Sequence, residues 1–342
     1  MKKVVVVHDP VEAIELYYAR GWTDGLPVVP ATPDNVAPMI AASGLPPDHV
    51  LGRYPERQRT ITVERVAVNA VLAGCKPEYM PVVVAAIEAL TDPLFGVHAE
   101  ACTTGGVGIL VVVNGPVVKQ IGLNAETVLF GHGNRANLAI GRTIRMVLVN
   151  VCGVIPGLVD RATLAHPSKI AFCIAENEAV SPWEPLHVER GFPRDQSAVT
   201  LFGCMGPVQA ENRFGTTHEQ VLRTIASTMS HSGSHNLNWQ GEYVVVMAQE
   251  HMQTVAASGW SKQVVKEFLW QHARRRVGEL KELGVLADPY EPGDEERWRH
   301  AVPSPDRITL ICAGGSAGRY STCLPGHGHP GITQSVSRLV RS

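Results

Sequence analysis

Short apolar runs rich in β-branched residues recur along this chain and alternate with segments that have a helical apolar pattern. The clearest runs are ILVVV at 109–113, YVVVM at 243–247 and ITLI at 308–311. Runs this short are typical of strands that are buried on both faces of a sheet. Helices are expected between them, most clearly over 134–149 and 261–275. The alternation predicts an α/β fold, without fixing the strand order.

The length of the chain predicts more than one hydrophobic core. At 342 residues it exceeds the size that one small core usually supports, so we expect two intimately packed α/β lobes, residues 1–210 and 211–342. The boundary falls among loop-like segments between 205 and 240. Further strands are predicted at 3–7, 60–63, 170–174 and 199–202, and further helices at 10–20, 33–42, 66–72, 81–90, 217–229 and 250–257.

Charge and hydropathy exclude several classes of partner. The net charge of -2 and the lack of long Lys or Arg runs argue against nucleic acid. No apolar run reaches the roughly 18 residues of a membrane span, and the first residues, MKKVVVVHDP, lack the long apolar region of a secretory signal. The seven cysteines form no CxxC pair, which suits reduced thiols. We therefore expect a cytoplasmic protein without a membrane partner.

The segment from Gly131 to Gly191 places many ionisable and amide side chains among core-type residues. Buried charges are costly unless they are paired or used, so this segment predicts a polar pocket. The pattern does not identify the reaction that the pocket supports.

The beginning of this segment, GHGNRA at 131–136, fits the relaxed dinucleotide fingerprint GxGxxA. The first acidic residue after it comes later than the fingerprint requires, which argues against nicotinamide or flavin binding. We interpret it as an anion site, in which Asn134, Arg135, Asn137 and Arg142 hold a carboxylate or phosphate at the start of a helix. The alternative is that Asn134 only caps the helix and that both arginines are solvated.

Carboxylates and histidines alternate in the end of the segment, IAENEAVSPWEPLHVERG. A strand continuing through Glu178 would place Glu176 and Glu178 on one face, and an extended 186–190 would do the same for His187 and Glu189. Such pairs suit general acid–base chemistry, although a surface turn braced by salt bridges is the alternative. The candidates for proton transfer are His166, Glu176, His187 and Glu189.

A glycine-rich loop follows the predicted strand at 308–311 and covers 312–331, CAGGSAGRYSTCLPGHGHPG. Backbone amides at the carboxyl end of such a strand favour ligand binding. The predicted anion cradle consists of Gly314, Gly315, Ser316, Arg319 and Ser321.

Cys323, in the same loop, is a candidate thiolate if Arg319 or His327 lowers its pKa. With His327 and His329 it also forms a candidate metal site, although a flexible turn is the alternative. The sequence predicts no definite cofactor and leaves a divalent metal open. Cys102 lies four residues after His98 and would be an activated nucleophile if the two side chains meet; a buried, inert cysteine is the alternative.

Three blocks carry a resemblance to a known family: GWTDGLPVVP, NRANLAIGR and DRATLAHPSKIAFCIAENE with SPWEPLHVERGF. The chain resembles a bacterial family associated with small proteins that carry a UGSC motif, in which selenocysteine or cysteine precedes Gly-Ser-Cys. This chain has no Cys-Gly-Ser-Cys of its own; CAGGS at 312–316 only resembles it. The resemblance implies a thiol-assisted or redox role together with a small thiol or selenol partner protein.

Taken together, the residues favour an enzyme that acts on a small anionic, carboxylate-bearing substrate by acid–base chemistry, as a lyase or hydrolase. The alternatives are a thiol- or metal-dependent oxidoreductase, and a ligand-binding subunit that works with a small cysteine-bearing partner. Homo-oligomer formation is a further expectation.

Overall fold

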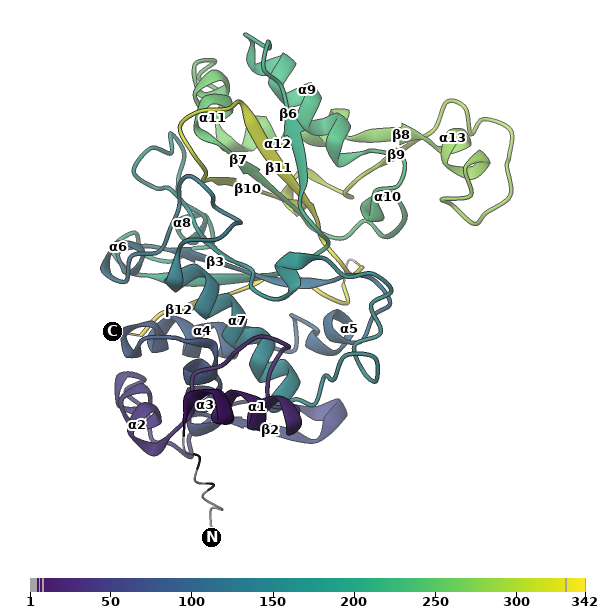
Figure 1. The fold of residues 1–342 in the computed structure, drawn as a ribbon. Coiled ribbons are helices and arrows are strands. Elements are labelled where there is room, and N and C mark those ends of the chain that lie inside the picture. Colours follow the sequence, from purple (N-terminus) through teal and green to yellow (C-terminus); the bar gives the residue numbers. More distant parts are fainter. Residues whose placement is uncertain (1–4, 6, 8, 330, 342) are drawn as a thin grey trace.

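The computed structural model describes residues 5, 7, 9–329 and 331–341. The strand predicted at 3–7 therefore lies largely outside the described residues. Two four-stranded sheets, each with helices on its outer side, form the body of the protein (Figure 1). The predicted α/β class is confirmed.

The first sheet has the strand order β12-β5-β3-β4. β3 (Gly108–Asn114) pairs in parallel with β4 (Cys173–Ala175) and antiparallel with β5 (Ala198–Cys204), to which β12 (Val336–Leu339) adds on the other side. Alternate β3 residues, Ile109, Val111 and Val113, face a core cluster made with helices of the first half. The helices of this layer are α3 (Val63–Ala73), α4 (Met80–Leu90) and α7 (Arg135–Asn150).

The second sheet has the order β10-β7-β11-β6. β10 (Ile308–Cys312) and β7 (Tyr243–Met247) are parallel, and β11 (Tyr320–Pro325) runs antiparallel between β7 and β6 (Val208–Glu211). Tyr243, Val245 and Met247 face the helical layer of this half. Its helices are α9 (His218–Met229), α11 (Gln249–Ala256) and α12 (Lys262–His272).

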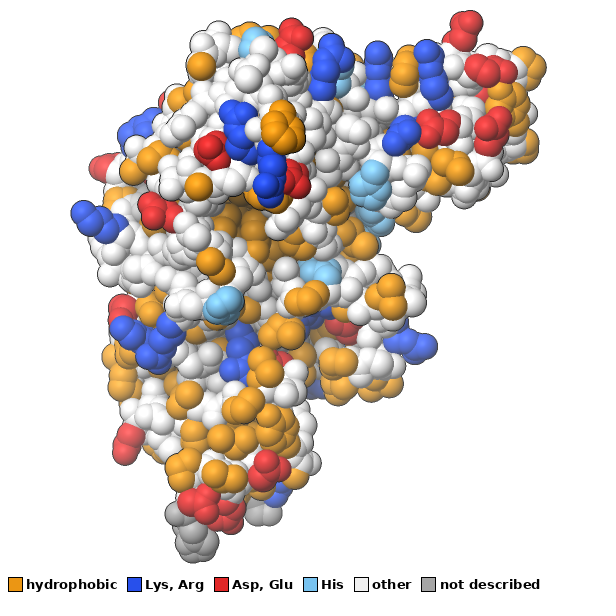
Figure 2. All heavy atoms as spheres, turned by 45° about the horizontal axis from the view of Figure 1, so that its top comes forward, with side chains coloured by type: hydrophobic (Ala, Val, Ile, Leu, Met, Phe, Trp, Pro, Cys, Tyr) orange, Lys and Arg blue, Asp and Glu red, His pale blue; other side chains and the backbone are white. Residues whose placement is uncertain are grey.

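The inner faces of the two sheets meet in a third apolar cluster. Leu110 and Val112 of β3 and Phe202 of β5 belong to the same cluster as Val244 and Val246 of β7. The residues that alternate with the helix-facing ones thus bury the other face of each strand, as their β-branched composition predicts. The architecture has four layers, in the order helices, sheet, sheet, helices. On the face shown in Figure 2, the molecule is hollowed between its two halves, and hydrophobic and histidine side chains line the hollow.

The carboxyl-terminal strand β12 pairs with β5 of the first sheet, although it lies in the half 211–342. The predicted division at residue 210 places β12 in the second lobe, whereas its strand pairing places it in the first sheet. Of its four residues only Val336 is buried, as suits an edge strand, and the sequence shows no alternation that would have predicted it. β11 was missed as well, because we interpreted 312–331 as one glycine-rich loop.

The remaining elements connect or flank these layers. The helices are α1 (Pro10–Ala19), α2 (Pro33–Ala42), α5 (Val97–Ala101), α6 (Val117–Gln120), α8 (Leu186–Glu189), α10 (His235–Trp239) and α13 (Val277–Glu282). The strands are β1 (Val50–Tyr54) with β2 (Arg59–Thr62) and β8 (Arg274–Arg276) with β9 (Trp298–His300), two antiparallel pairs. Among the described residues, no helix has both the length and the apolarity that crossing a membrane requires.

The layer between the sheets gives a direct stability prediction. Phe202 is 2% exposed and belongs to this layer, whereas Phe214 is 91% exposed. We expect Phe202→Ala to lower the free energy of unfolding by about 3 to 4 kcal/mol, because it leaves a cavity between two sheets that cannot both relax. Phe214→Ala is the matched control and should change it by less than about 0.5 kcal/mol. Urea denaturation measures both, and equal effects would contradict the assignment of this layer.

Candidate functional site

An open cavity of about 730 Å³ lies between the loop at 23–25, helix α7 and the segment 156–170. Arg145 and Val149 of α7 line one side of it, and His166 and Lys169 line another. Apolar side chains such as Leu164 and Ile170 contribute to the same wall. The cavity is thus large enough for a small organic molecule and offers it both charged and apolar contacts.

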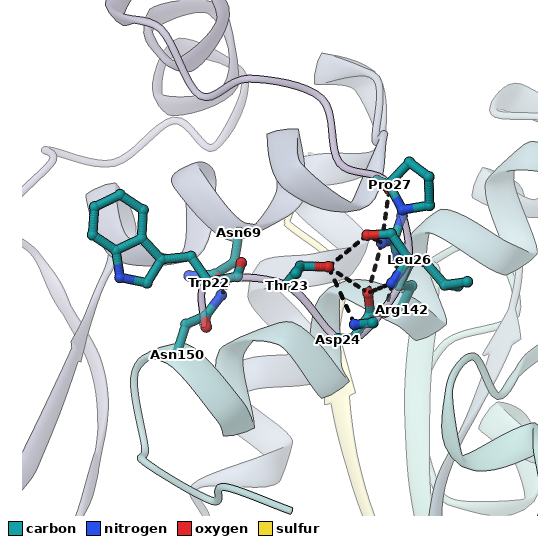
Figure 3. Close-up of polar contacts among 9 residues, drawn as sticks. Trp22, Thr23, Asp24, Leu26, Pro27, Asn69, Arg142 and Asn150 are labelled. Carbon is teal, nitrogen blue, oxygen red and sulfur yellow. Dashed lines mark hydrogen bonds and ion pairs between the residues drawn. The ribbon is translucent and has the colours of Figure 1, made fainter. Parts of the chain in front are cut away.

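The loop beside the cavity is fixed by Arg142 (Figure 3). Its guanidinium binds Asp24 in a bidentate manner, with Nε–Oδ2 and Nη2–Oδ1 distances of 2.7 Å each, and also donates to the carbonyls of Leu26 and Pro27. Burial alone would raise the pKa of Asp24, but the hydrogen bonds and charge of Arg142 hold it below its usual value. Asn150 adds a bond to the carbonyl of Trp22. Arg142, predicted to hold an anionic ligand, instead pairs with this chain's own carboxylate.

Three ionisable side chains form a compact cluster in the cavity wall. Lys169 Nζ lies 2.7 Å from Asp160 Oδ1, and Arg145 lies 3.6 Å from Asp160 Oδ2 while its Nε donates to the Lys169 carbonyl. All three side chains are about nine-tenths buried, and burial lowers the pKa of both Arg145 and Lys169. Two cations share one carboxylate, so the cluster carries a net positive charge at neutral pH.

His166 lies in a slot built from glycines. A Cβ atom on Gly108 would lie 3.1 Å from the imidazole Cε1, and one on Gly206 would lie 3.3 Å from its Cγ. The preceding residue, Ala165, has a φ of 62° and packs against Gly106, where a Cβ would approach its Cα to 2.9 Å. A non-glycine residue at positive φ is strained, and such strain persists only where surrounding contacts impose it. The backbone therefore holds the imidazole in one place in the cavity wall.

His166 is partly exposed but both of its ring nitrogens are buried, and neither has a hydrogen-bond partner of normal geometry among the described residues. Burial lowers its pKa, and the charges of Lys169 and Arg145 act in the same direction, against the carbonyls of Cys204 and Gly106. A neutral imidazole with a free lone pair is the form that a general base needs.

A second polar cluster lies at the carboxyl ends of the parallel strands β3 and β4. Asn114, the last residue of β3, donates to Glu176 Oε2 at 2.7 Å and to Glu178 Oε1 at 3.0 Å. His187 Nδ1 lies 3.8 Å from Glu178 Oε1. Glu176 and Glu178 are therefore close together, as predicted, although β4 ends at Ala175 and does not continue through Glu178. Residues 186–190 are not extended, however: Leu186–Glu189 form the short helix α8, whose first amide donates to Glu176 at 2.8 Å.

This second cluster is buried except at Glu178, whose side chain is 25% exposed, and it is incompletely hydrogen-bonded. Within the described part of the chain, several atoms of this cluster have no hydrogen-bond partner: Asn114 Oδ1, Glu176 Oε1, Asn177 Nδ2 and both ring nitrogens of His187. Burial raises the pKa of Glu176, which outweighs the opposing charge of Lys262. Glu189 is separate: it pairs with Lys262 at 2.8 Å and with Lys266, so it joins α8 to α12 and is committed to ion pairs.

The other predicted residues of the polar segment have structural roles. Asn134 caps α7 by accepting from the amide of Asn137 at 3.0 Å. Asn137 is buried and bonds the backbone of Asn124 and the carbonyl of Cys173. Arg135 donates to the carbonyl of Gly74 at 2.9 Å. None of the three lines the cavity near His166, because they belong to the first turn of α7 and that cavity adjoins its last turns.

The glycine-rich loop after β10 already holds a carboxylate of this chain. The amides of Gly318 and Arg319 both donate to Glu250 Oε2, the latter at 2.9 Å. The Arg319 guanidinium donates to the Gly215 carbonyl and the Thr254 hydroxyl, and Ser321 lies 2.9 Å from His251. The remaining predicted positions are Gly314, whose amide binds the Ala125 carbonyl, Gly315, which packs against Thr127, and Ser316, which is exposed.

Cys323 is not placed as a thiolate nucleophile. It is fully buried in the core between the second sheet and its helices, and burial raises its pKa. The described residues contain no group of three or more His, Cys, Asp or Glu side chains arranged to hold a metal ion. His327 instead contacts Glu100 at 3.1 Å, on the other side of β5.

His166 is among the predicted site residues, but its charged neighbours Arg145, Asp160 and Lys169 are not. Arg145 lies one turn after Arg142 on α7, and this spacing was the available signal that a second arginine reaches the same side of the helix. The pairing of Arg145 and Lys169 with Asp160 joins separate parts of the chain and is visible only in the fold. No protein-family model matches the chain, and a search among curated proteins finds no significant relative.

The Arg142 clamp predicts strong coupling between two residues. Because the Asp24 side chain is only 4% exposed, Arg142→Met leaves a buried carboxylate unpaired and should destabilise the protein by about 3 kcal/mol. The double variant Arg142→Met with Asp24→Asn should recover part of this loss. Urea denaturation of all four members of the cycle tests it, and strictly additive effects would show that the pair does not fix the loop.

Glu176 predicts a specific dependence of stability on pH. Its pKa is raised in the folded state, so the wild type loses stability as the pH rises from about 4.5 through the folded-state value, because only the unfolded chain ionises there. Glu176→Gln cannot ionise, and its stability relative to the wild type should increase across this range. Thermal unfolding between pH 4 and 8 measures the difference. The exposed Glu126→Gln is the control, and parallel curves for Glu176→Gln and the wild type would contradict the assignment.

Proposed function

We propose that this protein is an enzyme that binds a small carboxylate with an apolar substituent in the cavity beside His166 and acts on it by acid–base chemistry. The observation that carries the proposal is the position of His166, which lines an open cavity together with two cations and whose ring nitrogens lack a hydrogen-bond partner of normal geometry among the described residues. Site features of this kind, a concave pocket with convergent polar groups and shifted pKa values, support a catalytic role.

The charge balance of the cavity wall favours an anionic substrate. An ammonium group has three N–H donors, and the bond to Asp160 uses one of those on Lys169. Arg145 likewise has donors beyond its bonds to Asp160 and to the Lys169 carbonyl. A substrate carboxylate placed against these groups would neutralise the net positive charge of the cluster. The apolar side chains of Leu164, Pro167 and Ile170 then suit a hydrocarbon substituent.

In this arrangement His166 accepts the proton. A lone pair on one ring nitrogen removes a proton either from the carbon next to the bound carboxylate or from a water molecule, and the resulting imidazolium returns it later in the cycle. In the first route the electron pair left on that carbon forms a double bond while the bond from the neighbouring carbon to a leaving group breaks, and the imidazolium protonates that group, as in a lyase. In the second the hydroxide bonds to the carbonyl carbon of an ester or amide in the substrate, the bond to the alcohol or amine breaks, and the imidazolium protonates the leaving group, as in a hydrolase. Lys169 and Arg145 stabilise negative charge that develops on the substrate, and their proximity to the imidazole keeps it neutral before the reaction.

The test uses a panel of small carboxylic acids with apolar substituents, incubated with the purified protein in D2O and followed by NMR. Consumption of an acid, or exchange of the hydrogen next to its carboxylate, identifies a substrate. We expect His166→Gln to lower kcat at least about a hundredfold with little change in KM, because removal of a general base typically costs this much. His132→Gln, in an exposed loop, is the matched control. Unchanged turnover in His166→Gln would overturn the proposal.

The lowered pKa of His166 also predicts the pH profile. Only the neutral imidazole is a base, so kcat/KM should fall on the acid side with an apparent pKa below the ordinary histidine value of about 6.5.

Lys169→Met removes a cation from the cavity wall, and it should raise KM for the carboxylate at least about tenfold, whereas the exposed Lys119→Met should leave KM unchanged. An acid limb above 6.5, or equal KM values in both lysine variants, would contradict these roles.

A further inference from the structure

One of the seven cysteines differs from the others in its surroundings. Cys102 is partly exposed, whereas the six others are buried. Burial raises the pKa of several of these, to about 12 for Cys75, Cys152 and Cys312. A thiol that is buried in this way is inert, because the thiolate is the reactive form and needs solvation or a positive partner. Any thiol chemistry of the folded protein is therefore concentrated at Cys102.

Cys102 is part of a triad with His98 and Tyr54. His98 lies on α5 and Cys102 is the residue that ends this helix, so their spacing of four brings both side chains to one face. The Cys102 Sγ–His98 Nδ1 distance is 3.5 Å, and the Tyr54 hydroxyl lies 3.5 Å from the sulfur and 2.7 Å from the same nitrogen. Tyr54, at the end of β1, is fully buried and thus fixes the position of the imidazole beside the thiol.

We propose that Cys102 is a nucleophilic site at which the protein forms a covalent adduct with small electrophilic carbon compounds, with His98 as its base. The proposal does not depend on the function assigned to the His166 cavity. A cysteine next to an imidazole that can take its proton is the arrangement that activates thiols in nucleophilic catalysis. Part of Cys102 is exposed to solvent, whereas the other six cysteines are buried in the described structure.

The proposed step moves a proton within the triad and releases a leaving group to solvent. The Cys102 proton moves to Nδ1 of His98, and the sulfur electron pair forms a bond to the electrophilic carbon while the bond from that carbon to its leaving group breaks. The leaving group takes its electron pair into solvent, and the imidazolium then releases its proton to water. The other ionisable groups that bear on this site are Tyr54 and, through Tyr54, Glu56 and Cys152. Burial and hydrogen bonding to Cys102 raise the pKa of Tyr54, so its hydroxyl stays protonated during the step. This hydroxyl turns from Nδ1 to donate to the thiolate, 3.5 Å away, which leaves the Nδ1 lone pair for the thiol proton.

The test is alkylation of the folded full-length protein with iodoacetamide, followed by peptide mass spectrometry at each cysteine. In this reaction the S–C bond forms and iodide leaves. We expect Cys102 to be labelled first, at pH 7 at least about tenfold faster than a cysteine in an unstructured peptide, because the imidazole beside it accepts the thiol proton as the bond to carbon forms. His98→Gln should remove this advantage, and His132→Gln should keep it. Thermal unfolding shows whether each variant is folded.

The dependence of the labelling rate on pH separates activation from simple exposure, and the wild type alone supplies it. An activated thiol keeps a high rate below pH 8, whereas an exposed but unactivated thiol loses it in proportion to its thiolate fraction, since its pKa is about 8.5. Labelling of Cys102 that follows the peptide curve, or equal rates in His98→Gln and the wild type, would overturn the proposal. Neither result bears on the carboxylate turnover assigned to His166.

Discussion

The apolar layer between the two sheets is the constraint on which the rest of the structure depends. Strands β3 and β7 are buried on both faces, one against helices and the other against the opposite sheet. An ionisable side chain has no place in the middle of such a strand, because it would lose its hydrogen bonds to water without replacement. A small hydroxyl is tolerated where it finds a partner, as Thr200 of β5 does in Ser337. Polar and ionisable groups are therefore displaced to the ends of the strands, and the candidate sites lie there.

The two ends of β3 illustrate this division. At its first residue, Gly108, the backbone leaves room for the imidazole of His166, and the cavity opens to solvent beside it. At its last residue, Asn114, the side chain enters a closed cluster with Glu176 and Glu178. Both ends contain buried polar atoms without partners, but only the first has space for a substrate. Both groups of side chains contain a carboxylate and an imidazole, but only the one at Gly108 adjoins an open cavity and includes two cations.

Helices and strands were predicted correctly where the sequence carries strong local signals, such as capping residues and terminal glycines. Thr217 and Gln220 form a capping box at the start of α9, and Gly74, with a φ of 87°, ends α3, as such residues typically do. Site residues were harder, because a charged side chain looks the same in sequence whether it binds a ligand or another residue. Arg142 and Glu189 are committed to Asp24 and to two lysines, and the amides of the glycine-rich loop are committed to Glu250.

The sequence by itself determined the α/β class, most of the helices, the buried central strands and the concentration of polar residues between Gly131 and Gly191. These properties depend on periodicity, capping and turn residues, which act over a few positions. Only the tertiary structure decided that the two sheets pack face to face, that β12 returns to the first sheet, and that Arg145, Asp160 and Lys169 meet beside His166. Those outcomes depend on contacts between distant segments, and which charge finds which partner is set by the packed backbone and by the cost of burying an unpaired group.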